Sequence, residues 1–282
     1  MSLSILTNVS AMNVQQNLLN SSNAVATSME RLSSGLRINT AADDAAGYAI
    51  SEGLTSQVNG LNQASMNTSD AVSMVQTASS SLTNVQNMLQ RVYELGVQYN
   101  NGSNSSTDQS DIQSEVNQLT QEIDRQQGSS NFNGINLLNG SAGGSGTVTF
   151  QVGANGGDTL TATFSSVEGS SGLGMYSWSS AATGGTVIDL GSSTALASLT
   201  SAINNISSMA ATLGAVQNRL QYTSDSISST EQNLSASNSQ IKDVNMAQEM
   251  TNMTQEQILE QAGTSMLAQA NAQPQLILKL LG

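Results

Sequence analysis

An unbroken repeat of apolar and small residues, spaced three and four positions apart, runs from position 61 to position 99. This spacing is that of a coiled-coil seam, in which each of these residues faces a partner helix. The only proline of the chain is Pro274, so no proline interrupts the stretch. The pattern predicts one helix from 44 to 99, about 84 Å long. The seam residues are Leu61, Ala64, Thr68, Ala71, Val75, Ala78, Leu82, Val85, Leu89, Val92, Gly96 and Tyr99.

Two more stretches of the middle region have helical periodicity. Residues 107–127 carry apolar residues on one face and follow a turn cluster at 102–106, so this helix should lie antiparallel to the first. Residues 196–242 carry an apolar residue at every seventh position, which predicts another long helix. Thr40, followed by Asp43, matches the capping-box pattern and is expected to precede the first helix.

The segment between these helices has a different character. From 131 to about 193 the chain is rich in Gly, Ser, Thr and Asn, and helical periodicity is lost. Two alternating runs, 147–152 and 159–164, flank the Gly-rich stretch 153–157 and predict a β-hairpin. Residues 166–186 are predicted to form a loop, with Tyr176 and Trp178 packed down as anchors.

The charges missing from both ends point to assembly. The first 29 residues carry no charged side chain, and the last 22 carry only Lys279. An amphipathic helix without charges on its polar face is expected to be covered on several sides. We therefore expect the two terminal helices to bury their apolar stripes on each other and then on neighbouring copies. The candidate polymerisation residues are Ile5, Val9, Met12, Leu19, Leu259, Met266, Ile277 and Leu280.

The predicted fold class is mainly α. We expect an elongated rod, built as an antiparallel coiled coil or helical bundle, with a small β-hairpin region and with the N- and C-terminal helices paired. The expected segments are a terminal helix in 1–42, two helices in 43–140, the hairpin and loop in 141–195, a long helix in 196–242 and a tail helix in 243–282.

Composition excludes several classes of function. The net charge of −13 argues against nucleic-acid binding, which depends on Lys and Arg neutralising phosphates. The chain has neither His nor Cys, so the commonest general base and the commonest metal ligands are missing, and we expect no enzyme, metal site or cofactor. No stretch approaches the roughly 20 apolar residues of a membrane span, and the N-terminus lacks the basic and apolar regions of a secretory signal.

One set of polar residues is a candidate for recognition. Arg91 and Leu95 lie on the first predicted long helix, and Glu115 and Gln118 lie on the helix that should pack antiparallel to it. These four residues could form one exposed surface. The alternative is an ordinary helix surface with an Arg–Glu pair that contributes little to stability.

Several longer motifs resemble those of bacterial flagellins. They are the runs at 31–39 (RLSSGLRIN), 42–47 (ADDAAG), 213–220 (LGAVQNRL) and 266–275 (MLAQANAQPQ). The resemblance covers roughly 1–140 and 196–282. It implies an inner core domain made of the terminal helices, in 1–42 and 243–282, and an outer core domain made of 43–140 and 196–242. The central insertion is too short for the separate outer domains of larger flagellins.

The resemblance also implies a function and partners. It implies a structural subunit that polymerises into the extracellular flagellar filament for swimming motility. Such a subunit is exported unfolded by the flagellar type III apparatus, held by a flagellar secretion chaperone, and assembled with filament cap and hook-junction proteins. One alternative is a hook–filament junction protein of the flagellin-like family. A second is a secreted binding module or enzyme on a coiled-coil stalk.

Flagellins also carry a surface that an innate-immune Toll-like receptor recognises. The resemblance implies that this surface also exists in this chain and maps onto the residues around Arg91 and Glu115. A departure from the family pattern is Tyr93, which stands where many receptor-active flagellins carry a basic residue. The mapped residues are Arg91, Leu95 and Glu115, with Gln90, Gln98, Ile112 and Gln118 nearby.

Overall fold

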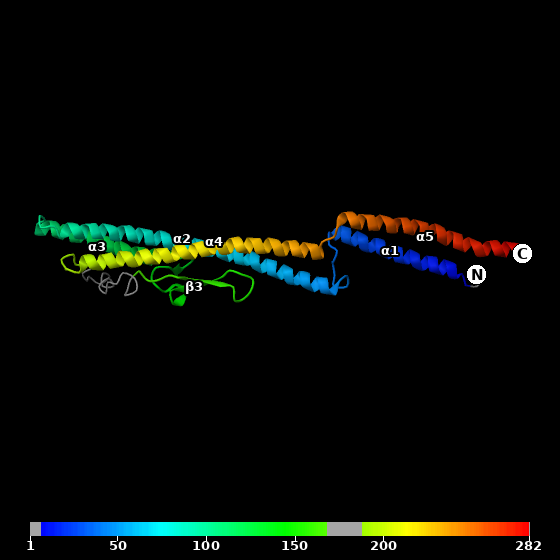
Figure 1. The fold of residues 1–282 in the computed structure, drawn as a ribbon, viewed down its shortest axis with the longest axis horizontal. Coiled ribbons are helices and arrows are strands. Elements are labelled where there is room, and N and C mark those ends of the chain that lie inside the picture. Colours follow the sequence, from blue (N-terminus) through cyan, green and yellow to red (C-terminus); the bar gives the residue numbers. More distant parts are fainter. Residues whose placement is uncertain (1–6, 168–187, 282) are drawn as a thin grey trace. The chain divides into compact units, whose positions relative to one another are not determined.

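The computed structural model describes residues 7–167 and 188–281, and for 274–281 it describes the backbone alone. These residues form five α-helices, a short 3-10 helix and two small antiparallel sheets, so the predicted mainly-α class is confirmed (Figure 1). Ile5, Tyr176, Trp178 and the side chains of Ile277 and Leu280 lie outside the described residues. The helices are α1 (Val9–Ser34), α2 (Ala45–Tyr99), α3 (Ser106–Ser129), α4 (Ala195–Lys242) and α5 (Met246–Leu281).

The chain divides into two compact units. One contains Met1–Gln57 and Asn233–Gly282, and the other contains Val58–Gln232. The limits predicted at 42/43 and 242/243 fall at the two breaks between helices, whereas α2 and α4 each contribute to both units. The assignment of these segments to inner and outer core domains remains a prediction.

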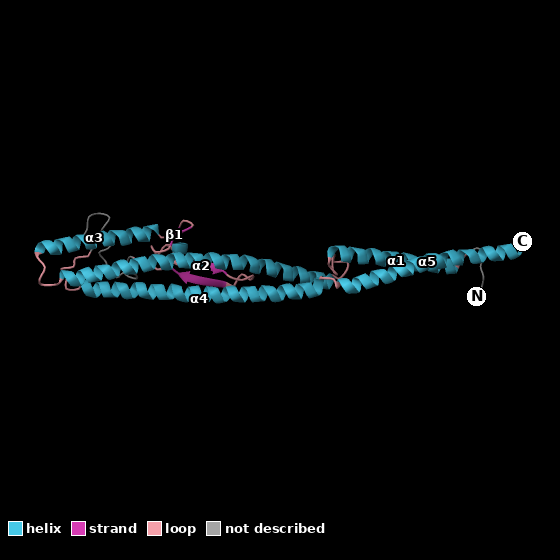
Figure 2. Ribbon diagram, turned by 90° about the horizontal axis from the view of Figure 1, so that it is seen from above, coloured by secondary structure: helices cyan, strands magenta, loops and turns pink. Residues whose placement is uncertain are grey.

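The unit formed by Val58–Gln232 is a bundle of α2, α3 and α4 (Figure 2). Eleven of the twelve predicted seam residues of α2, from Leu61 to Gly96, are buried, and Tyr99 is half-buried. From Ala71 to Val92 the seam shares one core with Ile112, Val116 and Ile123 of α3 and with Leu199, Ile206, Leu213 and Leu220 of α4. The seam is therefore confirmed. It explains why so long a helix is stable, because tertiary packing of an apolar face stabilises a helix more than propensity does.

The predicted β-hairpin is also confirmed. Strands β3 (Thr147–Gln151) and β4 (Thr159–Thr163) pair antiparallel, and Leu160, Ala162 and the following Phe164 are buried. A second hairpin, β1 (Asn131–Phe132) with β2 (Ile135–Asn136), was not predicted. Its two-residue turn needs positive φ at both positions, and Asn133 and Gly134 have φ of 49° and 79°. The Asn-Gly pair was the signal for it.

The caps of α2 and α3 are side-chain hydrogen bonds. At α3, Ser105 and Asp108 form a reciprocal capping box, and hydrogen bonds from Ser105 lower the pKa of Asp108. At α2, the prediction of Thr40 as the cap is wrong. Asp43 accepts from the Thr40 backbone N–H at 2.9 Å within a turn before the helix, while Asp44 Oδ1 accepts from the Gly47 N–H at 2.9 Å. Asp44 therefore caps α2, because it is the residue directly before the first helical turn.

The other unit is built mainly from the antiparallel pair of α1 and α5, with the first residues of α2 and the last residues of α4 (Figure 1). The predicted pairing of the terminal helices is thus confirmed. Only Val25 and Ser28 are buried in α1, and among the described side chains of α5 only Glu249 is buried. A pair with so few buried side chains has little stability of its own and gains most from further partners.

The two connections that end α1 and begin α5 are tied together by the backbone. Gly35 ends α1 with φ of 73°, and its carbonyl accepts from the Val244 N–H at 3.0 Å. The Arg37 N–H donates to the Lys242 carbonyl at 2.7 Å, and Arg37 Nη2 donates to the Ile241 carbonyl at 2.6 Å. These bonds satisfy backbone groups that both helix ends leave unpaired. They fix the point at which α1 ends and α5 begins.

Candidate assembly and recognition surfaces

The contact between α1 and α5 combines polar hydrogen bonds with apolar packing. Ser28 Oγ donates to Glu249 Oε1 at 2.7 Å in a buried position, and Arg31 Nη1 lies 4.0 Å from the same oxygen. At the other end of the pair, Asn8 Nδ2 donates to the Ala270 carbonyl at 2.9 Å. Gly263 leaves room for Leu18, because a Cβ at Gly263 would lie 3.1 Å from Leu18 Cδ1. Together these contacts set the antiparallel register.

The predicted stripes do not face each other, and the expectation that they bury on one another is wrong. Val9, Met12 and Leu19 are 61%, 62% and 52% exposed on α1. Leu259 and Met266 are 47% and 58% exposed on α5. The contact face of α1 is instead a second row at helical spacing, which the sequence analysis missed. It consists of Ala11, Val14, Leu18, Ser21, Val25 and Ser28, all partly or fully buried.

Because this second row makes the contact, the first row is left on the outside of the pair. Two shallow grooves lie beside the exposed residues of α5, and neither is lined by Val9, Met12 or Leu19. One lies on α5 and is lined by Met250, Ile258 and Leu259 with three polar residues, and its surface is mostly apolar. The other lies between α1 and α5, where Leu18, Leu259 and Met266 are among its lining residues. An exposed apolar surface of this kind marks a site of association rather than a solvated face.

The recognition candidate on α2 and α3 is centred on an ion pair. Arg91 donates from Nε at 3.1 Å and from Nη2 at 2.9 Å to Glu115 Oε1, and from Nη1 at 3.4 Å to Glu94. The hydrogen bonds with Glu115 raise the pKa of Arg91 above its ordinary value. Gln90, Gln98 and Gln118 are exposed, as are Arg91 and Glu115. The predicted meeting of α2 and α3 at Arg91 and Glu115 is confirmed.

Two residues mapped to that surface are not on it. Leu95 is 2% exposed and Ile112 is 8% exposed, and both belong to the core of the bundle. The expectation that Leu95 is part of an exposed set is therefore wrong. Leu95 lies four residues after Arg91 and shares its side of α2, but its side chain packs inward. Tyr93 is 37% exposed.

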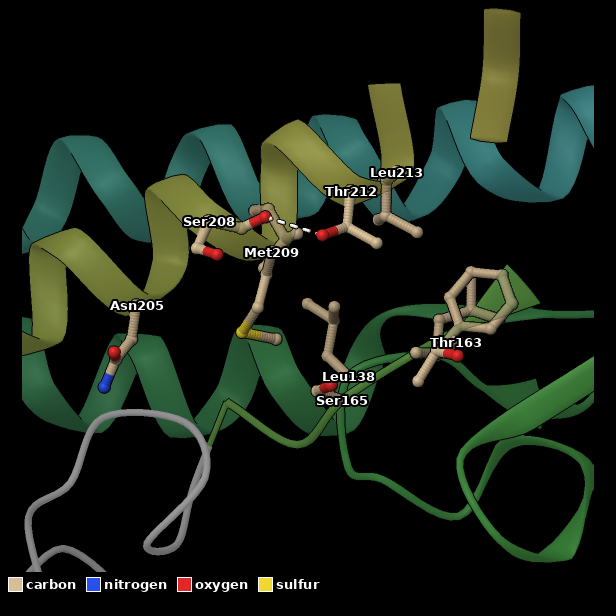
Figure 3. A pocket seen from close by; sticks show the side chains of 11 residues that line it. Leu138, Thr163, Ser165, Asn205, Ser208, Met209, Thr212 and Leu213 are labelled. Atoms are coloured by element: carbon tan, nitrogen blue, oxygen red, sulfur yellow. Dashed lines mark hydrogen bonds between the residues drawn. The ribbon is translucent and has the colours of Figure 1, made fainter. Parts of the chain in front are cut away.

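A cavity of about 230 Å³ lies in the same unit, under β4 and beside α4 (Figure 3). Met209 and Leu138 point toward its interior, and Thr163, Ser165 and Thr212 lie around it. None of its lining residues is charged, so it offers no group for acid–base chemistry. Among the described residues there is also no cluster of three acidic side chains that could hold a metal ion. No described helix is long and apolar enough to cross a membrane.

Comparison with known proteins identifies the family of the chain. Residues 5–143 match the bacterial flagellin N-terminal helical region, and residues 196–281 match the bacterial flagellin C-terminal helical region. The flagellar filament 33 kDa core protein of Treponema phagedenis is 43% identical, over 97% of this chain and 98% of that protein. The flagellin of Bacillus subtilis is 40% identical over the same shares. The crystal structure of Bacillus cereus flagellin is 29% identical, with a TM-score of 0.48, and covers 61% of this chain and 94% of that one.

A helical bundle and a pair of terminal helices with an exposed apolar face fit a structural, self-associating protein. The chain belongs to the bacterial flagellin family. Its function is that of a structural subunit of the flagellar filament, and the alternative of an enzyme on a coiled-coil stalk is excluded.

Proposed function

We propose that this subunit polymerises into the extracellular filament through the apolar residues that α1 and α5 leave exposed. The observation that carries the proposal is the exposure of Met12, Leu19, Leu259 and Met266 on α1 and α5, where no charged residue precedes Glu30 and only Lys279 follows Glu260. Neighbouring copies would cover these half-exposed residues, and each apolar side chain so covered contributes roughly 1 kcal/mol. Ile5, Val9, Ile277 and Leu280 belong to the same proposed interface.

We further propose the partners that membership of this family implies. The subunit is exported unfolded by the flagellar type III apparatus and is held before export by a secretion chaperone. It is added beneath the filament cap, above the hook-junction proteins. These partners rest on the family relationship, with no contact in the structure to specify them.

Electron microscopy of the purified chain in precipitating salt tests the polymerisation proposal. We expect long helical filaments, because the exposed stripes of one copy can be covered by the next without limit. A hook–filament junction protein would instead give short or closed assemblies. Such assemblies alone, at concentrations where related flagellins polymerise, would contradict the proposal.

We also propose that the exposed residues around the Arg91–Glu115 pair form a surface for a Toll-like receptor. The supporting observation is that Arg91 is held by two hydrogen bonds to Glu115 with half of its side chain exposed. A guanidinium already fixed in place loses less rotamer freedom on binding than a free one. Gln90, Gln98, Glu115 and Gln118 complete the exposed part of this surface, and Leu95 and Ile112 support it from below.

Replacing Arg91 with Ala should lower receptor activation by the free subunit by about tenfold or more, since Arg residues often dominate binding energy at interfaces. A cell reporter of receptor activation measures the effect. Arg125→Ala is the matched control, because Arg125 forms a similar exposed pair with Glu122 on α3. Equal losses in both variants would contradict the proposed surface.

A further inference from the structure

Methionine is prominent on the exposed surface of the terminal helices. Of the fifteen large hydrophobic residues that are exposed in the described chain, six are Met. Five of these six belong to the unit of α1 and α5. They are Met12, Met29, Met246, Met250 and Met266.

Three of these methionines lie on the proposed interface. Met12, 62% exposed, belongs to the stripe of α1. Met250 lines the apolar groove on α5 with Ile258 and Leu259, and Met266 lines the groove between α1 and α5 beside Leu18. In contrast, Met74 in the core of the bundle is 3% exposed. Solvent therefore reaches the sulfur-bearing side chains that would contact a neighbouring copy.

The chain also lacks the residue that usually reacts first with oxidants. It has twelve Met, one Trp and no Cys, so Met is its main oxidisable side chain. A two-electron oxidant such as hydrogen peroxide transfers one oxygen atom to the thioether sulfur. The methionine becomes the sulfoxide, and the peroxide is reduced to water. The product carries a strongly polar S=O group in place of an apolar sulfur.

We propose that Met12, Met250 and Met266 are three separate oxidation-sensitive positions at which peroxide controls assembly of the free subunit. The inference rests on the proposed polymerisation through α1 and α5. Sulfoxides on these residues must lose their water when a second copy covers them, and burying a polar group without a hydrogen-bond partner is unfavourable. Oxidation therefore blocks addition of the subunit, and burial in the filament protects the same residues afterwards.

The test compares free subunits with and without hydrogen peroxide treatment. Peptide mass spectrometry locates the sulfoxides, and sedimentation gives the critical concentration for polymerisation. We expect oxidation at Met12, Met250 and Met266, none at Met74, and a critical concentration raised by about tenfold or more. Methionine sulfoxide reductases should reverse the rise. Preformed filaments should be oxidised far less at these three positions.

A triple variant, Met12→Leu, Met250→Leu and Met266→Leu, separates sulfur chemistry from packing. Leu keeps the apolar surface but cannot be oxidised, so this variant should polymerise with or without peroxide. Met66→Leu is the control, because Met66 is 55% exposed but belongs to the other unit, and it should leave the sensitivity unchanged. Circular dichroism confirms that each variant is helical. If the triple variant is misfolded, the three single variants should each lower the sensitivity.

The outcomes separate the two proposals. If untreated wild-type subunits form no filaments, the proposed polymerisation itself fails. If untreated subunits polymerise and oxidised ones do so at the same critical concentration, only the oxidation proposal is overturned. A triple variant that remains as sensitive as the wild type also overturns it, since other methionines would then be responsible.

Discussion

A Leu259→Asp, Met266→Asp double variant should form no filaments at concentrations at which the wild-type subunit polymerises completely. Both residues lie on the exposed stripe of α5, and neither makes the contact with α1 that Ser28, Glu249 and Gly263 define. The free subunit should therefore fold normally. In the polymer, each Asp would be taken out of water without a partner, at a cost of several kcal/mol.

The effect on assembly should be large because the same contact recurs for every subunit. A loss of about 3 kcal/mol per contact raises the critical concentration by roughly a hundredfold. Sedimentation and electron microscopy measure it, and circular dichroism checks the helices. The matched control is Gln261→Asp, Thr264→Asp, which adds the same charge at exposed positions on the opposite side of α5. Filaments from the stripe variant, or equal failure of the control, would show that the stripe is not the interface.

The second large effect is on stability, at Leu95. Leu95→Ala should lower the free energy of unfolding by about 2–5 kcal/mol, because it removes a side chain that is 2% exposed and leaves a cavity in the bundle. Chemical denaturation followed by circular dichroism measures the change. Val97→Ala is the matched control on the same helix, since Val97 is 52% exposed, and it should change stability by about 0.5 kcal/mol or less.

This result bears on the receptor proposal. If Leu95→Ala lowers receptor activation, the loss should follow from unfolding or from displacement of Arg91 by the disturbed core. Activation would then recover at temperatures low enough to keep the variant folded. A Leu95→Ala subunit of unchanged stability would instead place Leu95 on the surface, contrary to its burial in the core of the bundle.

The helices themselves could be predicted because their signals are local. The helix predicted from 44 to 99 agrees with α2 within one residue, and the alternating runs correspond to β3 and β4. The Asn133-Gly134 hairpin was missed although its signal was equally local. At Thr40, a capping pattern was present, but the helix began one turn later, at a cap by Asp44.

It was harder to predict which face of a helix is buried than to predict where the helix lies in the sequence. Helical spacing on α1 is satisfied by two rows, one through Met12 and Leu19 and the other through Val14, Leu18 and Val25. Periodicity shows that each row shares a face, but it cannot show which row a partner helix covers. The same ambiguity placed Leu95 on the surface with Arg91. Rotating α1 about its axis by less than half a turn would exchange the row that α5 covers and the row that stays exposed.

The sequence by itself therefore determined the family and the helical elements. It also predicted that the charge-free ends are covered by a further partner. The tertiary structure alone decided which residues of α1 and α5 contact each other. That choice depends on side chains far apart in the sequence, namely the buried Ser28–Glu249 hydrogen bond and the space that Gly263 leaves for Leu18. These contacts set rotation and register together, and they leave Met12, Leu19, Leu259 and Met266 facing outward.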